Sequence, residues 1–139
     1  MIRVVIDTSV LIRYLIRPSA AVKELIEVRW LADQVRMVTA PELIEELEGV
    51  LARDFVQALI RPEEGQALLH AIHLKAEIVG PLLGNVPPYT RDPKDDKFVA
   101  CALVGDAAYV ISEDKDLLAL GVLEGIRMVT PYEFIQRTG

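Results

Sequence analysis

The sequence predicts an α/β protein, a three-layer α/β/α sandwich with a mainly parallel sheet of about five strands. Strand-like segments alternate with helical segments along the chain, which is the pattern of parallel strands joined by right-handed crossovers. The strand-like segments are apolar without polar alternation, as expected for strands covered by helices on both faces. Because the chain has 139 residues, we expect a single domain over residues 1–139.

The first strand is predicted in the opening segment MIRVVIDTS, where residues 4–6 are consecutive and β-branched. Asp7 follows at its carboxyl end, where open α/β folds place their ligands. Thr8 and Ser9 are suited to cap the next helix, expected over residues 10–16. Asp7 is therefore either a turn residue or one member of an acidic site, and the other acids decide between the two.

The remaining elements follow from apolar periodicity and from proline and glycine breaks. Trp30 is assigned to the core or to an interface rather than to base stacking. His70 and His73 are assigned to the surface or the core edge rather than to a metal site. Helices are predicted at residues 20–33, 41–51, 54–75 and 117–120, in a segment that ends at Gly105, and from Pro131 onward; the helical segment at 54–75 is broken at Pro62. Strands are predicted at residues 36–39, 76–79, 107–112 and 127–130.

The predicted helix PELIEELEGVL, residues 41–51, carries four glutamates around one apolar stripe. Glu42 and Glu45 are expected to be solvated. Glu46 and Glu48 border the stripe on opposite sides, and periodicity alone does not say which of them turns towards a cleft.

A second acidic stretch lies in RDPKDDKFVACALVGDAAYVISEDKDLLALG, residues 91–121. Asp95 or Asp96 is expected to cap the helix that follows. Further acids, including Asp114 and Asp116, stand at the carboxyl end of the strand at 107–112. Because parallel strands end at one sheet edge, Asp7, Asp114 and Asp116 are expected there, with Glu46 and Asp96 near the same rim.

Carboxylates gathered at one edge repel one another and raise each other's pKa unless a cation neutralises them. Magnesium and manganese prefer such oxygen ligands, and an ion held this way can activate water and stabilise charge on a phosphodiester. Neither histidine lies near the predicted rim, so a serine or cysteine nucleophile with a histidine base is not supported. The sequence also contains no Gly-rich phosphate loop.

Composition and charge narrow the possible classes of protein further. A formal charge of -6 argues against binding nucleic acid through overall charge. The mean hydropathy is +0.30, but no apolar run approaches the roughly 18 residues of a membrane span, so no membrane association is expected. Cys101 is the single cysteine, which excludes an internal disulfide and fits a reducing cytoplasm.

Four segments in this order resemble the motifs of the PIN-domain family, in particular the VapC-like toxins of prokaryotic toxin–antitoxin pairs. They are DTSVLI at 7–12, PELIEELEGVL at 41–51, RDPKDDKFVACAL at 91–103 and SEDKDLL at 112–118. Two departures are Ala40, where relatives often have serine, and Glu113, where close relatives often have glycine and which adds an acid beside the site.

The resemblance implies a ribonuclease that hydrolyses RNA with metal-activated water. Its implied ligands for Mg²⁺ or Mn²⁺ are Asp7, Glu46, Asp96 and Asp114, with Asp116 as an auxiliary; Asp95 is expected to face solvent. Thr8, Ser9 and Ser112 would orient ligands or water. Candidate RNA contacts near the motifs are Arg13, Arg17, Arg91, Lys94 and Lys97.

The resemblance further implies a cytoplasmic toxin, a cognate antitoxin that covers the acidic groove, and a homodimer. Two other classes stay open. One is a non-catalytic PIN-like module that binds RNA or protein. The other is a receiver-like phospho-acceptor domain, which would need a lysine at the end of a late strand, whereas Lys115 sits in a run of acids. A haloacid-dehalogenase-type phosphatase is disfavoured because Ser9 stands where its second aspartate belongs.

Overall fold

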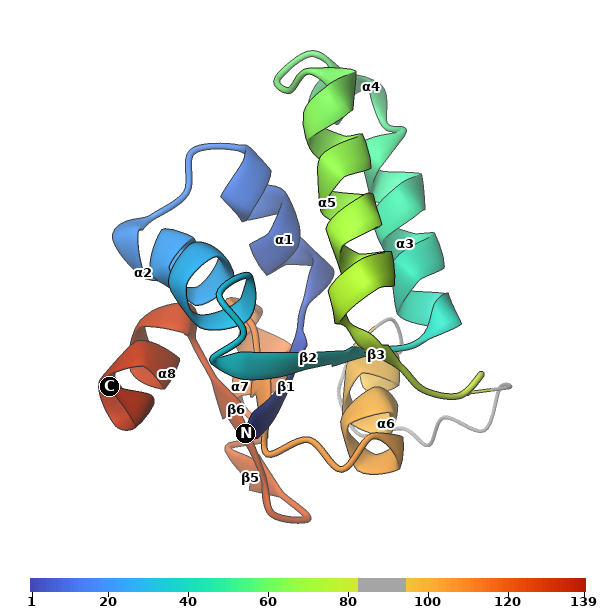
Figure 1. The fold of residues 1–139 in the computed structure, drawn as a ribbon. Coiled ribbons are helices and arrows are strands. Elements are labelled where there is room, and N and C mark those ends of the chain that lie inside the picture. The colour runs from blue at the N-terminus through green and yellow to red at the C-terminus, as the bar shows by residue number, and fades with distance from the viewer. Residues whose placement is uncertain (83–94) are drawn as a thin grey trace.

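The computed structural model describes residues 1–82 and 95–139. In this part of the chain, a six-stranded sheet has the order β3-β2-β1-β4-β6-β5, parallel except for the β5–β6 pair (Figure 1). This confirms the predicted α/β class. The strands are β1 Ile2–Ile6, β2 Val35–Thr39, β3 Glu77–Ile78, β4 Tyr109–Ile111, β5 Val122–Leu123 and β6 Ile126–Val129.

Helices cover both faces of the sheet. One core cluster joins the sheet to α1, α2, η1, α8 and the α3–α5 helices, and a second joins the other face to α6 and α7. Figure 1 shows α3 and α5 running side by side away from the sheet. The helices are α1 Thr8–Leu15, α2 Ala20–Lys23, the π-helix η1 Glu24–Trp30, α3 Pro41–Leu51, α4 Asp54–Gln57, α5 Pro62–Lys75, α6 Asp96–Val104, α7 Lys115–Leu118 and α8 Pro131–Thr138.

The central strand β1 is covered on both faces, as its unbroken apolar run predicts. Val4 and Ile6 lie in one core cluster and Val5 lies in the other. The backbone N–H of Asp7 donates to the carbonyl of Ile111 at 2.9 Å, so the carboxyl ends of β1 and β4 adjoin. This pairing places the residues that follow the two strands at one edge.

Three local features differ from what the sequence predicts. The first helix begins at Thr8 rather than at residue 10, because Asp7 itself is the N-cap residue. The predicted helix at 20–33 consists of α2 and the π-helix η1, and ends at Trp30. The short strand β5 was not predicted, because its two residues are too few to form a periodic pattern.

The middle of helix α6, residues 98–102, lies within the second core and includes the only cysteine of the chain. Burial raises the pKa of the Cys101 thiol to about 12. The thiol therefore stays protonated at neutral pH, and the thiolate that would react with an alkylating reagent is scarce. We expect iodoacetamide at pH 8 to leave Cys101 intact in the native protein and to modify it fully in 8 M urea, as measured by intact mass. Rapid modification of the native protein would contradict this burial.

Candidate active site

Asp7 connects β1 to α1 and lies almost completely buried, with 4% of its surface exposed. Its Oδ2 accepts hydrogen bonds from Ser112 Oγ at 2.6 Å and Ser9 Oγ at 3.1 Å. Its Oδ1 accepts a bond from the backbone N–H of Ser9 at 3.3 Å. Asp7 therefore caps α1 and also lies among the polar groups at the carboxyl edge of the sheet. It is a turn residue and, at the same time, a candidate member of an acidic site.

Burial raises the pKa of the Asp7 carboxyl above its usual value. The hydrogen bonds from Ser112 and Ser9 oppose this shift, whereas the nearby negative charge of Glu46 adds to it. The ionised form of Asp7 is thus costly in the protein alone. A cation bound beside it would favour that form.

Ser112 joins Asp7 to the acids that follow β4. It is fully buried, and while its hydroxyl donates to Asp7, its oxygen accepts from the backbone N–H of Asp114 at 2.9 Å. Asp114 in turn caps α7, because its Oδ1 accepts from the backbone N–H groups of Asp116 at 2.8 Å and Leu117 at 3.3 Å. One serine therefore holds two of the predicted metal ligands in a fixed relation.

Glu46 is the glutamate of α3 that reaches the end of β1. Its Oε2 accepts from the hydroxyl of Thr8, and its Oε1 lies 2.7 Å from Lys97 Nζ. Glu48 is exposed on the other side of the apolar stripe. Of the two glutamates that border the stripe, Glu46 is therefore the one that turns towards the acidic edge. Glu45 is exposed as predicted.

Glu42 was predicted to be solvated, and this is wrong. Its side chain is partly buried, and its Oε2 accepts from the backbone N–H of Leu82 at 2.7 Å. A helical wheel shows only which side of a helix a residue occupies, and here a distant segment of the chain covers that side.

The start of α6 brings two further acids inside. Asp96 is 3% exposed and Asp95 is 8% exposed, so the expectation that Asp95 faces solvent is wrong. Oxygen atoms of Asp95, Asp114 and Asp116 lie within 4.8 Å of one another. Asp95 is the N-cap residue of α6, and α6 packs against β4, which brings this carboxylate to the segment after that strand. The acid-rich DPKDD run was the available signal for Asp95.

The donor set suits a hard divalent cation. Asp95, Asp114 and Asp116 bring their carboxylate oxygens close enough together to hold one ion, and burial raises the pKa of Asp7, which a cation would lower. These oxygen ligands fit Mg²⁺ or Mn²⁺ better than a metal that prefers sulfur or imidazole. His70 and His73 on α5 belong to no such group within the described residues.

The candidate RNA contacts have different surroundings. Arg13 pairs with the exposed Glu113 at 3.0 Å, so the acid that departs from the family pattern has a cationic partner. Arg17 is exposed just after α1, and Lys97 pairs with Glu46. Arg91 and Lys94 lie outside the described residues.

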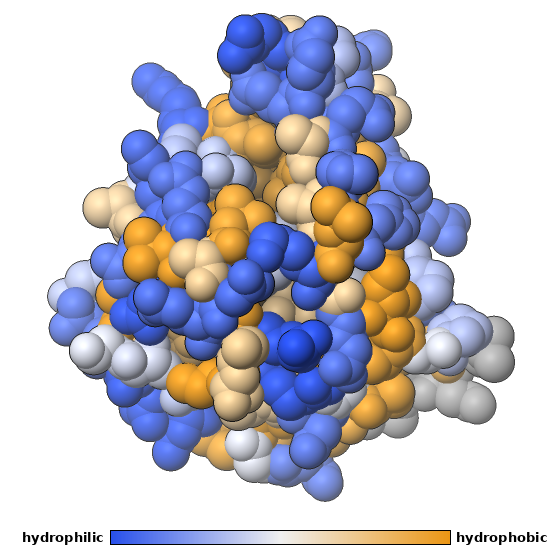
Figure 2. All heavy atoms as spheres, in the orientation of Figure 1, coloured by the Kyte–Doolittle hydropathy of each residue, from blue (hydrophilic) through white to orange (hydrophobic). Residues whose placement is uncertain are grey.

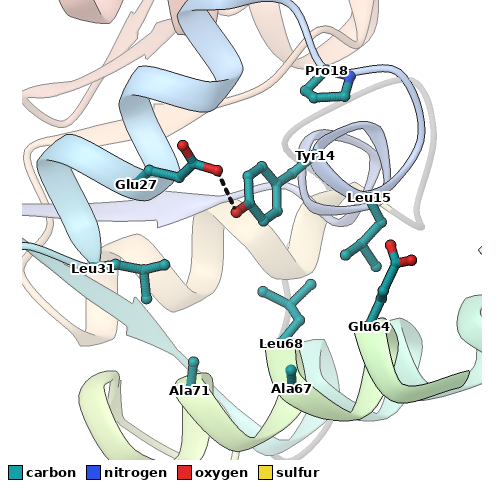
Figure 3. Close-up of a pocket in the computed structure, with 9 residues that line it drawn as sticks. All are labelled: Tyr14, Leu15, Pro18, Glu27, Leu31, Glu64, Ala67, Leu68 and Ala71. Atoms are coloured by element: carbon teal, nitrogen blue, oxygen red, sulfur yellow. Dashed lines mark hydrogen bonds between the residues drawn. The ribbon is translucent and has the colours of Figure 1, made fainter. Parts of the chain in front are cut away.

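A separate hollow of about 330 Å³ lies between α1, η1 and α5. Most of its lining is apolar, and Leu15 and Leu68 point into it, while the hydroxyl of Tyr14 donates to Glu27 at 2.8 Å (Figure 3). Figure 2 shows hydrophilic side chains over most of this face, with apolar ones in patches between them. The hollow shares no lining residue with the acidic edge.

Comparison with known proteins decides the family. A family model described as PIN domain matches residues 3–116. The chain belongs to the PIN-domain family. The matched segment of this PIN domain contains each of the predicted acidic residues, from Asp7 to Asp116. A search of curated proteins found no match.

Two solved structures resemble the PIN domain described above. VapBC2 from Rickettsia felis, bound to a DNA fragment from their promoter, gives a TM-score of 0.60 at 12% identity, covering 91% of this chain and 97% of that chain. FitAcB from Neisseria gonorrhoeae gives a TM-score of 0.62 at 15% identity, covering 93% of this chain and 98% of that chain. At these identities the likeness shows the fold alone. Among the described residues, no helix is long and apolar enough to cross a membrane.

Proposed function

We propose that this PIN domain is a metal-dependent ribonuclease whose ligands are Asp7, Glu46, Asp96 and Asp114, with Asp116 as an auxiliary. The observation that carries the proposal is the link through Ser112, which donates to Asp7 at 2.6 Å and accepts from the Asp114 backbone at 2.9 Å. A buried hydroxyl that binds the carboxylate of one ligand and the backbone N–H of a second is the support expected for a metal site. Burial of Asp95 beside Asp114 adds a further acid, which we propose as a second auxiliary.

The chain's own residues hold and orient the reacting groups. Ser112 and Ser9 orient the Asp7 carboxylate, and Thr8 orients Glu46. Burial excludes water from around Asp7, which strengthens its interaction with any positive charge at the site. When bound, Mg²⁺ or Mn²⁺ would supply an activated water and stabilise the charge that develops on the phosphodiester. Arg13, Arg17, Arg91, Lys94 and Lys97 are the proposed RNA contacts.

We also propose that the protein is a cytoplasmic toxin that a cognate antitoxin neutralises, and that it forms a homodimer. The structural likeness to VapBC2 and FitAcB supports the proposal that this chain has a protein partner. A partner segment that covers the acidic edge would need a basic side chain to match these carboxylates. The apolar hollow beside Leu15 and Leu68 offers the same partner a surface on which to bury apolar side chains.

Cleavage of labelled single-stranded RNA tests the proposed activity. We expect cleavage with Mg²⁺ or Mn²⁺, no cleavage with EDTA, and none by the Asp7→Asn and Asp96→Asn variants. Cleavage that persists in both variants would indicate a contaminating nuclease. Metal binding without cleavage of any RNA would favour the non-catalytic binding module instead.

The role assigned to Ser112 is tested by Ser112→Ala. This change removes the 2.6 Å bond to Asp7 and the acceptor for the Asp114 backbone, so both ligands lose their orientation. Removal of such supporting groups weakens metal affinity or activity by about 10- to 100-fold. Manganese titration and RNA cleavage measure the two effects, and Ser19→Ala, which removes a helix cap at α2, is the matched control for stability. An unchanged manganese affinity in Ser112→Ala would contradict the role.

A further inference from the structure

Lys97 is a resident cation at the candidate metal centre. Its Nζ lies 2.7 Å from Glu46 Oε1, and both side chains are only 24% exposed. The other oxygen of Glu46 accepts from the hydroxyl of Thr8. Each carboxylate oxygen of Glu46 thus already has a partner supplied by the chain. One of those partners carries a full positive charge.

The position of Lys97 ties this charge to the proposed ligands. It follows Asp96 directly in the first turn of α6, so an acid of the centre and the ammonium are presented by one helical turn. Its Nζ also lies 5.9 Å from the ring centroid of Phe98, whose side chain is buried. Because α6 packs against β1 and α3, the ammonium cannot move far from Glu46 without leaving a partly buried carboxylate uncompensated.

Two-metal nucleases use two cations, which together stabilise the attacking and leaving oxygens of the phosphodiester. A divalent ion bound at Glu46 would have to displace the ammonium, or would meet its positive charge at short range in a partly desolvated place. We propose that Lys97 supplies the second positive charge of this centre, so that each chain binds a single divalent ion, held on the Asp7 and Asp114 side. This refines the proposed ligand set, because Glu46 then serves as the partner of the ammonium and not as a direct ligand of the ion. The inference rests on the proposed function.

The ammonium then has a defined part in the reaction. It neutralises Glu46 before RNA arrives and stays within the centre as a donor to a non-bridging phosphate oxygen. Lysine serves here as a compact point charge, which a guanidinium replaces in charge but not in shape. This role differs from that of a surface phosphate contact, because it sets how many metal ions the protein binds in the absence of RNA.

The number of bound Mn²⁺ ions per chain tests the inference, measured by electron paramagnetic resonance titration without RNA. We expect about one Mn²⁺ for the wild type and for Lys97→Arg, and about two for Lys97→Met, which keeps the length of the side chain but not its charge. Lys75→Met is the matched control, because Lys75 forms a 2.8 Å pair with Asp33 away from the centre, and it should bind about one ion.

Two ions in the wild type, or one in Lys97→Met, would overturn the role of Lys97 and leave the proposed nuclease intact. No Mn²⁺ bound to the wild type would instead overturn the proposed metal centre itself. If circular dichroism shows that Lys97→Met does not fold, the number of Mn²⁺ ions bound per wild-type chain still tests the inference. Lys97→Gln then provides the second neutral variant.

Discussion

Replacing Asp7 with asparagine is expected to abolish RNA cleavage and to raise the melting temperature of the metal-free protein at neutral pH. Cleavage should fall by at least about 100-fold in kcat/KM, because the variant loses a ligand charge in the centre. Stability should rise because burial raises the pKa of Asp7, so the ionised carboxylate disfavours the folded state. For a domain of this size, each ~1 kcal/mol of added stability raises the melting temperature by about 3–6 °C.

The pH dependence of stability follows from the same shift. Because the pKa of Asp7 is higher in the folded protein than in the unfolded chain, its contribution to stability falls as pH rises from 3.8, the unfolded value, through the folded value. The stability advantage of Asp7→Asn should therefore be largest near neutral pH and disappear towards pH 4. Thermal melts of both proteins between pH 4 and 8 measure it.

The matched control is Asp106→Asn, an exposed aspartate before β4, at the opposite end of that strand from Asp7. It should alter neither cleavage nor melting temperature. Added Mg²⁺ should raise the melting temperature of the wild type and leave that of Asp7→Asn unchanged. A less stable Asp7→Asn at neutral pH without metal would contradict the electrostatic cost assigned to this carboxylate.

Phe134→Ala is expected to destabilise the protein by about 3–5 kcal/mol, lowering the melting temperature by roughly 10 °C or more. Phe134 lies on α8, is fully buried, and its ring meets that of Tyr109 edge-on with centroids 5.0 Å apart. It belongs to the core cluster that includes Val4 and Ile6 of β1, the strand that leads into Asp7. Loss of this packing should therefore weaken the support of the site.

Tyr132→Ala is the control on the same helix, because Tyr132 is 64% exposed and its loss should change stability by less than about 0.5 kcal/mol. Urea unfolding of both variants measures the difference. Phe134 lies beyond residues 3–116, the segment matched by the family model. Equal effects of the two changes would mean that α8 adds nothing to the core, contrary to its packing.

The fold was predictable because its signals are local. The apolar run of β1, the proline at the start of α3 and the alternation of strands with helices specify the parallel sheet and its helical layers. The π-helix η1 and the two-residue strand β5 were not predicted. Their geometry depends on packing against other elements, which leaves no periodic pattern in a short segment.

The candidate site was predictable only in part. Because both residues follow the ends of parallel strands, the sequence correctly predicted that Asp7 and Asp114 lie at one edge of the sheet, where Ser112 links them. Sequence periodicity describes one helix at a time, so it did not show that Asp95 is buried or that Lys97 reaches Glu46 from another helix. Both features arise where α6 meets other parts of the fold.

Whether metal-activated water attacks the phosphodiester is tested by the chemistry of the cut RNA, with cleavage carried out in ¹⁸O-labelled water. We expect an ¹⁸O atom to enter the phosphate at the cut only when Mg²⁺ or Mn²⁺ is present, because water is the nucleophile. Cleavage in EDTA, or accumulation of a 2′,3′-cyclic phosphate end without ¹⁸O, would contradict this mechanism.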